Sequence, residues 1–168
     1  MILLLGAAAA RADGSAAARR LLALGVRERW GLEELPALER RPGGKPCFPA
    51  FPQYHFNLTH TDGLCLCALS DAPVGVDAEQ VRRRRAGLPR YVMSDAEFAA
   101  FDGSWEEFTR IWTLKEAYCK YLGRSIWPPR TVPVPPPVSF HTYSGPGWRA
   151  ALCGTEPLPP AVQMLVLD

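Results

Sequence analysis

The stretch "FTRIWTLKEAYCKYLG" (residues 108–123) has the periodicity of an amphipathic helix, and Gly123 is a typical helix stop. At 100° per residue, Lys115 falls in the middle of the apolar face, whereas Glu116 and Lys120 share a polar flank. The Glu116–Lys120 pair is either an ordinary i,i+4 ion pair or part of a site. Lys115 either extends its ammonium past the apolar face to solvent or faces an anion in a crevice. That apolar face comprises Phe108, Ile111, Trp112, Cys119 and Leu122.

Other segments predict further helices and strands. A capping box formed by Ser94 and Glu97 begins a helical region that continues to Leu122 and breaks at residues 102–104. Gly- and Pro-rich residues 40–54 predict a loop, and proline-rich residues 124–140 an extended connection. We expect the apolar runs 64–70 and 73–79 to form a buried hairpin. The remaining expected elements are a strand at 2–5, a helix at 15–30, and strands at 138–144, 147–154 and 162–167.

Composition predicts a globular chain with one domain or two small halves. The 168 residues are 48% hydrophobic with a net charge of +2, which does not indicate nucleic-acid binding. Five cysteines without a C-x-x-C pair favour neither a disulfide framework nor a zinc site, so we expect a reduced, cytoplasmic protein. The N-terminal "MILLLGAAAA" (1–10) resembles a signal peptide but lacks a basic start, and a strand is the better interpretation. No membrane-spanning segment is expected.

Two carboxylates, Asp77 and Glu79, lie two residues apart in "GVDAE" (75–79). In a strand they would point to the same side, about 7 Å apart. They are either solvated acids at a strand end or a pair that needs a cation or a proton. Oxygen ligands favour Mg²⁺, and Glu116 would supply a third carboxylate.

His60 lies in "FNLTHTDG" (56–63), among Asn57, Thr59 and other polar residues before an apolar strand. A histidine in such a position is either a surface residue or, in a phosphate site, a hydrogen-bond donor. The sequence alone leaves both interpretations open.

Four motifs in this order resemble those of the 4′-phosphopantetheinyl transferases of the Sfp-like type. Any one of them alone is weak, but the ordered set is specific and spans residues 44–123. The motifs are "GKPCFP" (44–49), "FNLTHTDG" (56–63), "VGVDAE" (74–79) and "FTRIWTLKEAYCKYLG" (108–123).

The resemblance implies an enzyme of the holo-[acyl-carrier-protein] synthase type. Such an enzyme moves the phosphopantetheine of coenzyme A to a serine of an apo acyl or peptidyl carrier protein, and releases 3′,5′-adenosine bisphosphate. The family fold is α+β, with two similar halves related by a pseudo-twofold axis. Carried onto this chain, the halves would be residues 1–72, on the coenzyme side, and 73–168, with the metal site and the catalytic helix. A monomer would suffice, without nucleic acid or membrane as partners.

The resemblance also implies residue roles. Asp77, Glu79 and Glu116 would hold Mg²⁺ against the pyrophosphate. Lys115 and Lys120 would face the reacting centre, with Lys120 on a pyrophosphate oxygen. Glu116 would be the base for the serine proton, or the anchor of a basic water. Such positioning and charge neutralisation are what phosphoryl transfer requires. The coenzyme contacts would be Lys45 and Pro46 on the nucleotide, Thr59 and His60 on phosphates, and Arg11 near the N-terminus.

The chain departs from the family pattern in several places. It is short, its N-terminal region is trimmed, and "GRS" (123–125) replaces a Gly-Lys-Gly turn. The run "RRRR" (82–85) is either a solvated charge run or a patch that steers an acidic carrier protein.

Two rival functions follow from these departures. One is a coenzyme A-binding module without catalysis, against which the intact Asp77, Glu79, Glu116 and Lys120 argue. The other is a different Mg²⁺-dependent phosphoryl-transfer enzyme, which would usually supply more carboxylate or histidine ligands. Fatty-acid, polyketide and peptide-synthesis carriers, and free or acylated coenzyme A, all remain open.

Overall fold

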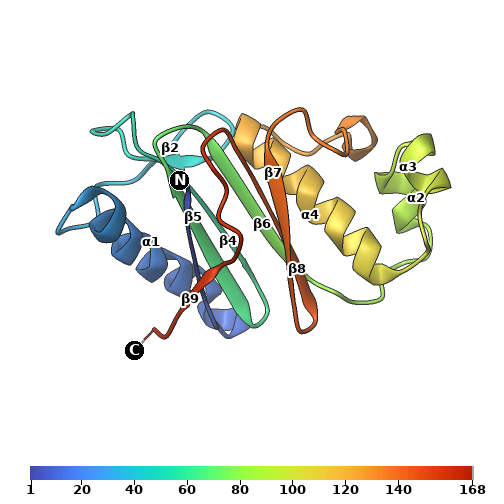
Figure 1. Ribbon diagram of the computed structural model, residues 1–168, viewed down its shortest axis with the longest axis horizontal. Helices are drawn as coiled ribbons and strands as arrows, with labels where there is room; N and C mark the ends of the chain where they lie inside the picture. The colour runs from blue at the N-terminus through green and yellow to red at the C-terminus, as the bar shows by residue number, and fades with distance from the viewer. Residues whose placement is uncertain (168) are drawn as a thin grey trace.

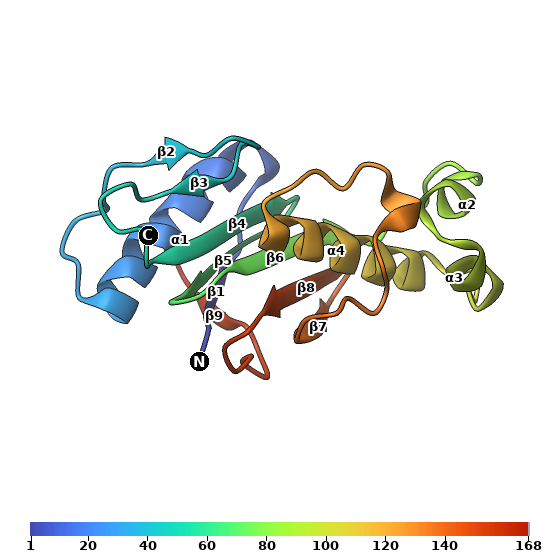
Figure 2. The same cartoon turned by 90° about the horizontal axis from the view of Figure 1, so that it is seen from above.

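The computed structural model describes residues 1–167 and has two small sheets and two long helices (Figures 1 and 2). The first sheet has strand order β4-β5-β1-β9 and the second has order β6-β8-β7. A short two-stranded ladder, β2-β3, lies beside the first sheet. The strands are β1 (Leu3–Ala7), β2 (Glu39–Arg40), β3 (Pro46–Cys47), β4 (His55–Thr61), β5 (Leu64–Ser70), β6 (Val74–Gln80), β7 (Phe140–Gly145), β8 (Trp148–Gly154) and β9 (Gln163–Leu165).

The helices cover opposite parts of the molecule. The first sheet packs one face on α1 and the other face on the second sheet, and α4 covers the outer face of the second sheet. The mixed α+β class predicted from the sequence is therefore confirmed. The α-helices are α1 (Gly14–Trp30), α2 (Leu88–Val92), α3 (Asp95–Ala99) and α4 (Trp105–Leu122), and the 3₁₀ turns are η1 (Arg11–Asp13) and η2 (Pro129–Thr131).

Local signals explain where the helices begin and end. Ser94 and Glu97 form the predicted capping box of α3, and Ser104 caps α4 by accepting from the Glu107 amide at 3.1 Å. Gly123 ends α4 with φ +70°, a left-handed conformation that favours glycine. The predicted break at residues 102–104 is thus confirmed.

The predicted hairpin between residues 64–70 and 73–79 is wrong. The first run is β5 and pairs with β1 and β4, whereas the second is β6, which pairs with β8 in the other sheet. The actual hairpin joins β4 to β5 through Asp62 and Gly63, with Gly63 at φ +84°. An Asp-Gly pair is a strong turn signal, so the interpretation of residues 56–63 as a strand entry missed a full strand.

Gly75 lets α4 approach β6 closely. A β-carbon on Gly75 would overlap the Ala117 carbonyl oxygen and the Tyr121 amide nitrogen. The side chains of Val74, Val76 and other alternate residues point to the opposite side, into the core between the sheets. The face of β6 that carries Gly75 therefore lies directly under α4.

Gly75→Ala is expected to destabilise the protein by about 3 kcal/mol, since backbone atoms cannot move aside as a flexible side chain can. Urea unfolding measures this change. Gly87→Ala is the matched control, because a β-carbon there meets nothing within 4 Å, and its effect should stay within about 0.5 kcal/mol. Equal effects of the two substitutions would contradict the close packing of α4 on β6.

Glu156 links the start of β1 and the end of β5, which lie at the same end of the first sheet, to α1. Its carboxylate accepts from the Met1 ammonium at 3.0 Å, from the Ser70 hydroxyl at 2.8 Å and from Arg29. Burial opposes ionisation, but these hydrogen bonds and that of the Asp71 amide outweigh it and lower the pKa of Glu156 to about 2.

The low pKa of Glu156 predicts acid sensitivity. Because the folded pKa is depressed, the stabilisation is present above the ordinary value of 4.5 and is lost as the pH falls toward 2. Glu156→Gln should remove this contribution to the fall in the free energy of unfolding between pH 4.5 and pH 2, as measured by unfolding curves at a series of pH values. If the free energy of unfolding of the variant still fell with pH as it does in the parent protein, the role of the carboxylate would be contradicted.

Within residues 1–167, no helix has both the length and the apolar character needed to cross a membrane.

Candidate functional site

Asp77 lies at the centre of a polar cluster where the edge strands β4 and β6 meet α4. It is on β6, two residues after Gly75, so it points toward α4 and is only 5% exposed. Its Oδ1 accepts from the Lys120 ammonium at 2.7 Å and from the Thr59 hydroxyl at 3.2 Å. Residues from β4, β6 and α4 therefore meet at one carboxylate.

The edge strands β4 and β6 are joined here by side chains, not by a ladder of main-chain bonds. Asn57 Oδ1 accepts from the Val76 amide at 2.8 Å, and Thr59 reaches Asp77. Asn57 and Thr59 are two residues apart on β4, so both point to the same side. The first sheet thus supplies polar side chains to one wall of the site, the second sheet supplies Asp77 and Glu79, and α4 supplies Glu116.

The three predicted carboxylates influence one another. Burial, followed by the charges of Asp77 and Glu79 and opposed by Lys120, raises the pKa of Glu116 to about 7. Burial and Asp77 also raise the pKa of Glu79, whose carboxylate pairs with Arg84 at 3.2 Å. Asp77 and Glu79 share one face of β6, and Lys120 of α4 contacts Asp77 there. The charges of both carboxylates act on Glu116, which lies on α4 four residues before Lys120. We refer to Asp77, Glu79, Glu116 and Lys120 as the carboxylate cluster.

The oxygen donors of this cluster are of the type that a hard cation prefers. Within residues 1–167, Asp77 Oδ2 is the buried side-chain atom without a hydrogen-bond partner. This unpartnered oxygen and the raised pKa values of Glu79 and Glu116 indicate that the negative charge of the three carboxylates is not fully balanced by nearby cations. In the same range, no group of three or more His, Cys, Asp or Glu side chains is placed so that it could hold a metal ion. The ammonium of Lys120 and the guanidinium of Arg84 are instead the cations that the carboxylates contact.

Lys115 lies on another side of α4 from this cluster. It is fully buried, and its ammonium donates to the Pro129 and Val132 carbonyls at 3.0 and 2.8 Å and pairs with Glu97 at 2.7 Å. Neither a solvent-reaching side chain nor contact with the Asp77 cluster is observed. Through these contacts, Lys115 links α3 and the proline-rich segment to α4.

Lys45 and Pro46 lie where the β2–β3 segment meets α4. The Lys45 ammonium donates to the Val74 carbonyl at 2.8 Å and to the Lys120 carbonyl at 2.7 Å. A cavity of about 230 Å³ lies beside them and is also lined by Asn57 and Lys120. It therefore adjoins the carboxylate cluster.

Thr59 and His60 point to opposite sides of β4, because they are consecutive strand residues. Thr59 faces Asp77, whereas the exposed His60 lies against Gly14 at the start of α1. Arg11 is exposed in η1, just before that helix. The structure does not bring His60 and Arg11 to the carboxylates.

Sequence reasoning missed two residues of the site, Asn57 as the link to β6 and Arg84 as the partner of Glu79. Asn57 lies in the "FNLTHTDG" motif at the same strand phase as Thr59, which would have indicated its direction. Arg84 is one of four consecutive arginines (residues 82–85), and no sequence pattern distinguishes it from the other three.

Comparisons with known proteins agree with this geometry. The family model for the 4′-phosphopantetheinyl transferase superfamily matches residues 73–146, which contain β6 and α4. The 4′-phosphopantetheinyl transferase Sfp of Bacillus subtilis (strain 168) is 26% identical over 136 residues, covering 68% of this chain and 61% of that protein. The 4′-phosphopantetheinyl transferase AcpT of Salmonella typhi is 36% identical over 104 residues, covering 57% of this chain and 54% of that protein.

The matched proteins are named as transferases, and the match to the family model includes β6 and α4, which carry Asp77, Glu79 and Glu116. The resemblance to the 4′-phosphopantetheinyl transferases that was predicted from four motifs is confirmed. The chain spans about three fifths of the length of Sfp. The activity of the full-length relatives is therefore a proposal for this chain.

Proposed function

We propose that this protein transfers the 4′-phosphopantetheine of coenzyme A to a serine of an apo carrier protein and releases 3′,5′-adenosine bisphosphate. The observation that carries the proposal is the cluster of Asp77, Glu79, Glu116 and Lys120, in a chain that resembles this superfamily. In the reaction, the serine oxygen forms a bond to the β-phosphorus of the pyrophosphate. The bond from that phosphorus to the bridging oxygen breaks, and the serine proton leaves.

In this proposal, Asp77, Glu79 and Glu116 hold Mg²⁺, which when bound neutralises pyrophosphate charge that repels the nucleophile. The unpartnered Oδ2 of Asp77 supports this assignment. Lys120 stabilises charge on a pyrophosphate oxygen, since its ammonium already lies within 2.7 Å of the cluster. Glu116 takes the serine proton, and its partial exposure leaves it accessible to a partner.

The coenzyme would lie where β4, the β2–β3 segment and α4 meet. The cavity beside Lys45, Pro46, Asn57 and Lys120 would receive the part next to the pyrophosphate, with Thr59 donating to a phosphate oxygen. We keep His60 and Arg11 as further phosphate contacts at the start of α1, and Lys115 as a support of α4. We also propose that residues 1–72 and 73–168 form two similar halves, and that one cytoplasmic chain acts as a monomer.

The direct test incubates the protein with coenzyme A, Mg²⁺ and an apo carrier protein, and weighs the carrier by mass spectrometry. An increase in the mass of the carrier equal to one phosphopantetheine group supports the proposal. Bound coenzyme without any gain across several carriers would favour the inert binding module. Hydrolysis of phosphate esters without a carrier would favour another Mg²⁺-dependent phosphoryl-transfer enzyme.

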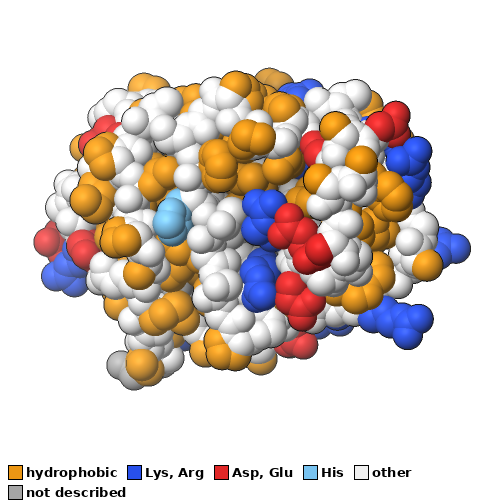
Figure 3. Space-filling model, turned by 45° about the vertical axis from the view of Figure 1, so that its right-hand side comes forward, with side chains coloured by type: hydrophobic (Ala, Val, Ile, Leu, Met, Phe, Trp, Pro, Cys, Tyr) orange, Lys and Arg blue, Asp and Glu red, His pale blue; other side chains and the backbone are white. Residues whose placement is uncertain are grey.

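The carrier protein would approach over the segment that follows β6. Arg82, Arg83 and Arg85 are exposed there, while Arg84 pairs with Glu79 of the cluster. Nearby, Tyr91 and Trp127 are both exposed and lie 5.6 Å apart. Figure 3 shows charged side chains of both signs beside hydrophobic ones on the side of the molecule that carries α2 and α3. A basic and aromatic surface suits an acidic protein partner.

Replacing Arg82, Arg83 and Arg85 together with alanine should lower kcat/KM for an acidic carrier by about tenfold, with kcat changed less. The loss should shrink as salt concentration rises, because exposed charges are screened. Replacing Arg19, Arg20 and Arg27 of α1 is the matched control, since these arginines are also exposed. Equal effects of the two triple variants would show that the patch does not guide the carrier.

A further inference from the structure

Arg84 contacts Glu79, one of the proposed metal ligands, from outside the carboxylate cluster. Its Nη2 lies 3.2 Å from Glu79 Oε2, and the two side chains are 27% and 30% exposed. Ion pairs with this much exposure are weak, because water screens both partners. Arg84 can therefore exchange Glu79 for another anion at a small cost in free energy.

The segment that carries Arg84 has few main-chain restraints. Residues 81–85 belong to no helix or strand. The Val81 amide donates to the Gly147 carbonyl at 2.8 Å, and the Arg85 carbonyl accepts from the Leu88 amide at 3.0 Å. Between these two points, and counting partners anywhere in residues 1–167, the main chain of residues 82–84 makes no main-chain hydrogen bond. This part of the chain can therefore shift without breaking regular structure.

The contact with Arg84 and a bound divalent cation compete for Glu79. While Arg84 and Lys120 hold the carboxylates, no three acidic side chains of residues 1–167 are placed so that they could hold a metal ion. Asp77 nevertheless keeps a buried oxygen, Oδ2, without a partner. A divalent cation beside Glu79 would repel the guanidinium of Arg84, since like charges a few ångströms apart destabilise each other. Glu79 can thus turn to a cation beside Asp77 only when Arg84 leaves it.

The neighbours of Arg84 face solvent and offer it an alternative anion. Arg82, Arg83 and Arg85 are exposed on the same segment, where the proposed acidic partner would approach. A guanidinium binds a carboxylate through two parallel hydrogen bonds, so a partner's carboxylate is a full replacement for Glu79.

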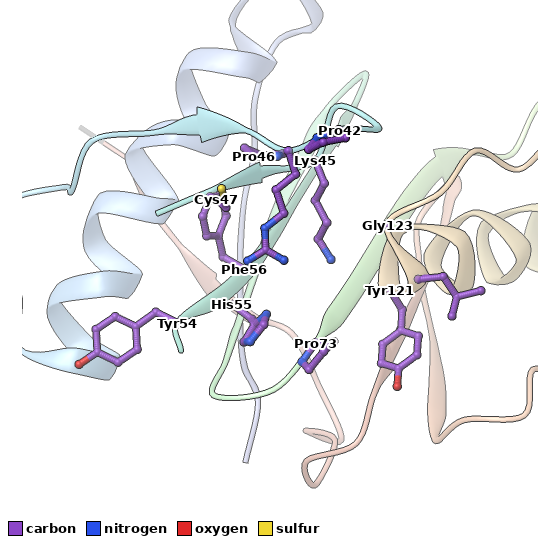
Figure 4. Close-up of a pocket in the computed structure, with 12 residues that line it drawn as sticks. Pro42, Lys45, Pro46, Cys47, Tyr54, His55, Phe56, Pro73, Tyr121 and Gly123 are labelled. Atoms are coloured by element: carbon purple, nitrogen blue, oxygen red, sulfur yellow. The ribbon is translucent and has the colours of Figure 1, made fainter. Parts of the chain in front are cut away.

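Arg84 lies away from the proposed coenzyme contacts. Lys45 and Pro46 line a cavity of about 460 Å³ between β3, the start of β4 and the C-terminal end of α4 (Figure 4), and they also line the smaller cavity beside Lys120. No residue of the segment 79–90 lines either cavity. An anion that draws Arg84 away from Glu79 therefore does not compete with the coenzyme for space.

We propose that Arg84 exchanges Glu79 for a carboxylate of an acidic protein partner, and that this exchange couples the binding of the partner to the binding of a divalent cation. In the free protein, Arg84 holds Glu79 away from the cation. When the partner draws Arg84 outward, Glu79 turns to a cation beside Asp77. The coupling is reciprocal, so the cation strengthens partner binding by the same factor. This inference rests on the ligand set of the proposed function.

Binding of Mn²⁺ alone, without coenzyme or carrier, tests the first half of the exchange. Mn²⁺ takes the same oxygen ligands as Mg²⁺, and its electron paramagnetic resonance signal reports the free ion. Arg84→Gln should bind Mn²⁺ about fivefold more tightly than the parent protein, because a weak competing ion pair is removed. Arg83→Gln is the matched control, since it removes the same charge from the next residue, and its affinity should stay within about twofold. Equal affinities of the two variants, or weaker binding by Arg84→Gln, would overturn the proposal.

A short fluorescein-labelled polyglutamate peptide tests the second half, with its affinity measured by fluorescence polarisation at constant ionic strength. Saturating Mg²⁺ should tighten peptide binding about fivefold in the parent protein and in Arg83→Gln, relative to Arg84→Gln. Any effect of Mg²⁺ on the peptide itself is common to the three proteins and cancels in this comparison. The same response to Mg²⁺ in all three proteins would show that Arg84 does not couple the two sites.

Asp77→Asn separates failure of this inference from failure of the proposed function. Loss of Mn²⁺ binding in Asp77→Asn, with equal affinities of Arg84→Gln and Arg83→Gln, would overturn the exchange alone and leave the ligand set in place. Unchanged Mn²⁺ binding in Asp77→Asn, or no Mn²⁺ binding by any of these proteins, would contradict the ligand set and the exchange together. The mass of the carrier reports transfer independently of all these results.

Discussion

Asp77→Asn is expected to reduce phosphopantetheine transfer by about 100-fold or more, while the protein keeps its circular dichroism spectrum and cooperative unfolding. Asparagine retains the shape of the side chain but removes the negative charge that Lys120 contacts and that the proposed metal needs. Glu116→Gln should have a similarly large effect, because it removes both a proposed ligand and the proposed base. Mass measurement of the carrier at a series of times gives the rate.

The control for both variants is Glu106→Gln, an exposed carboxylate in the first turn of α4. It should keep near-normal transfer, which would exclude a general effect of charge on the helix. Near-normal transfer by Asp77→Asn or Glu116→Gln would falsify the proposed ligand set. An equal loss in Glu106→Gln would show that the assay reports the stability of α4, not the site.

Lys115→Met is expected to lower the free energy of unfolding by about 3 kcal/mol. Methionine keeps most of the volume of the side chain, but the Glu97 carboxylate and the Pro129 and Val132 carbonyls lose their buried partner. Urea unfolding measures the loss, and hydrogen exchange should show early opening of α3 and residues 129–132.

An exposed ion pair on the same helix provides the comparison. Glu107 and Arg110 pair at 2.6 Å but are each about one third exposed, so Glu107→Gln should cost less than about 0.5 kcal/mol. A loss below about 1 kcal/mol for Lys115→Met would contradict the buried network. If that variant does not fold, Glu97→Gln tests the same network from its other side.

The helices and the family could be predicted from sequence because their signals are local. The capping box at Ser94, the stop at Gly123 and the spacing of "GVDAE" each depend on nearby residues, and the structure agrees with all three. The prediction that Asp77 and Glu79 point to one side also holds, since strand alternation fixes it.

The partners of long side chains could not be predicted in the same way. Helical angles placed Lys115 correctly on the apolar face, but its actual partners, Glu97 and the carbonyls of the proline-rich segment, depend on how distant segments pack. The hairpin was predicted wrongly for a similar reason. Residues 64–70 and 73–79 are close in the sequence, which favoured pairing them with each other, but β6 pairs with the distant strand β8. The proposed roles of Lys45, His60 and Arg11 remain predictions.

The junction of β4 and β6 has a consequence for how the site can move. Strands in one sheet are held about 4.8 Å apart by a continuous series of main-chain bonds, which makes their spacing rigid. Here the amide oxygen of Asn57 and the hydroxyl of Thr59, both on β4, bridge to β6 instead. A substrate that replaces these few contacts can widen the gap between the two walls without breaking either sheet.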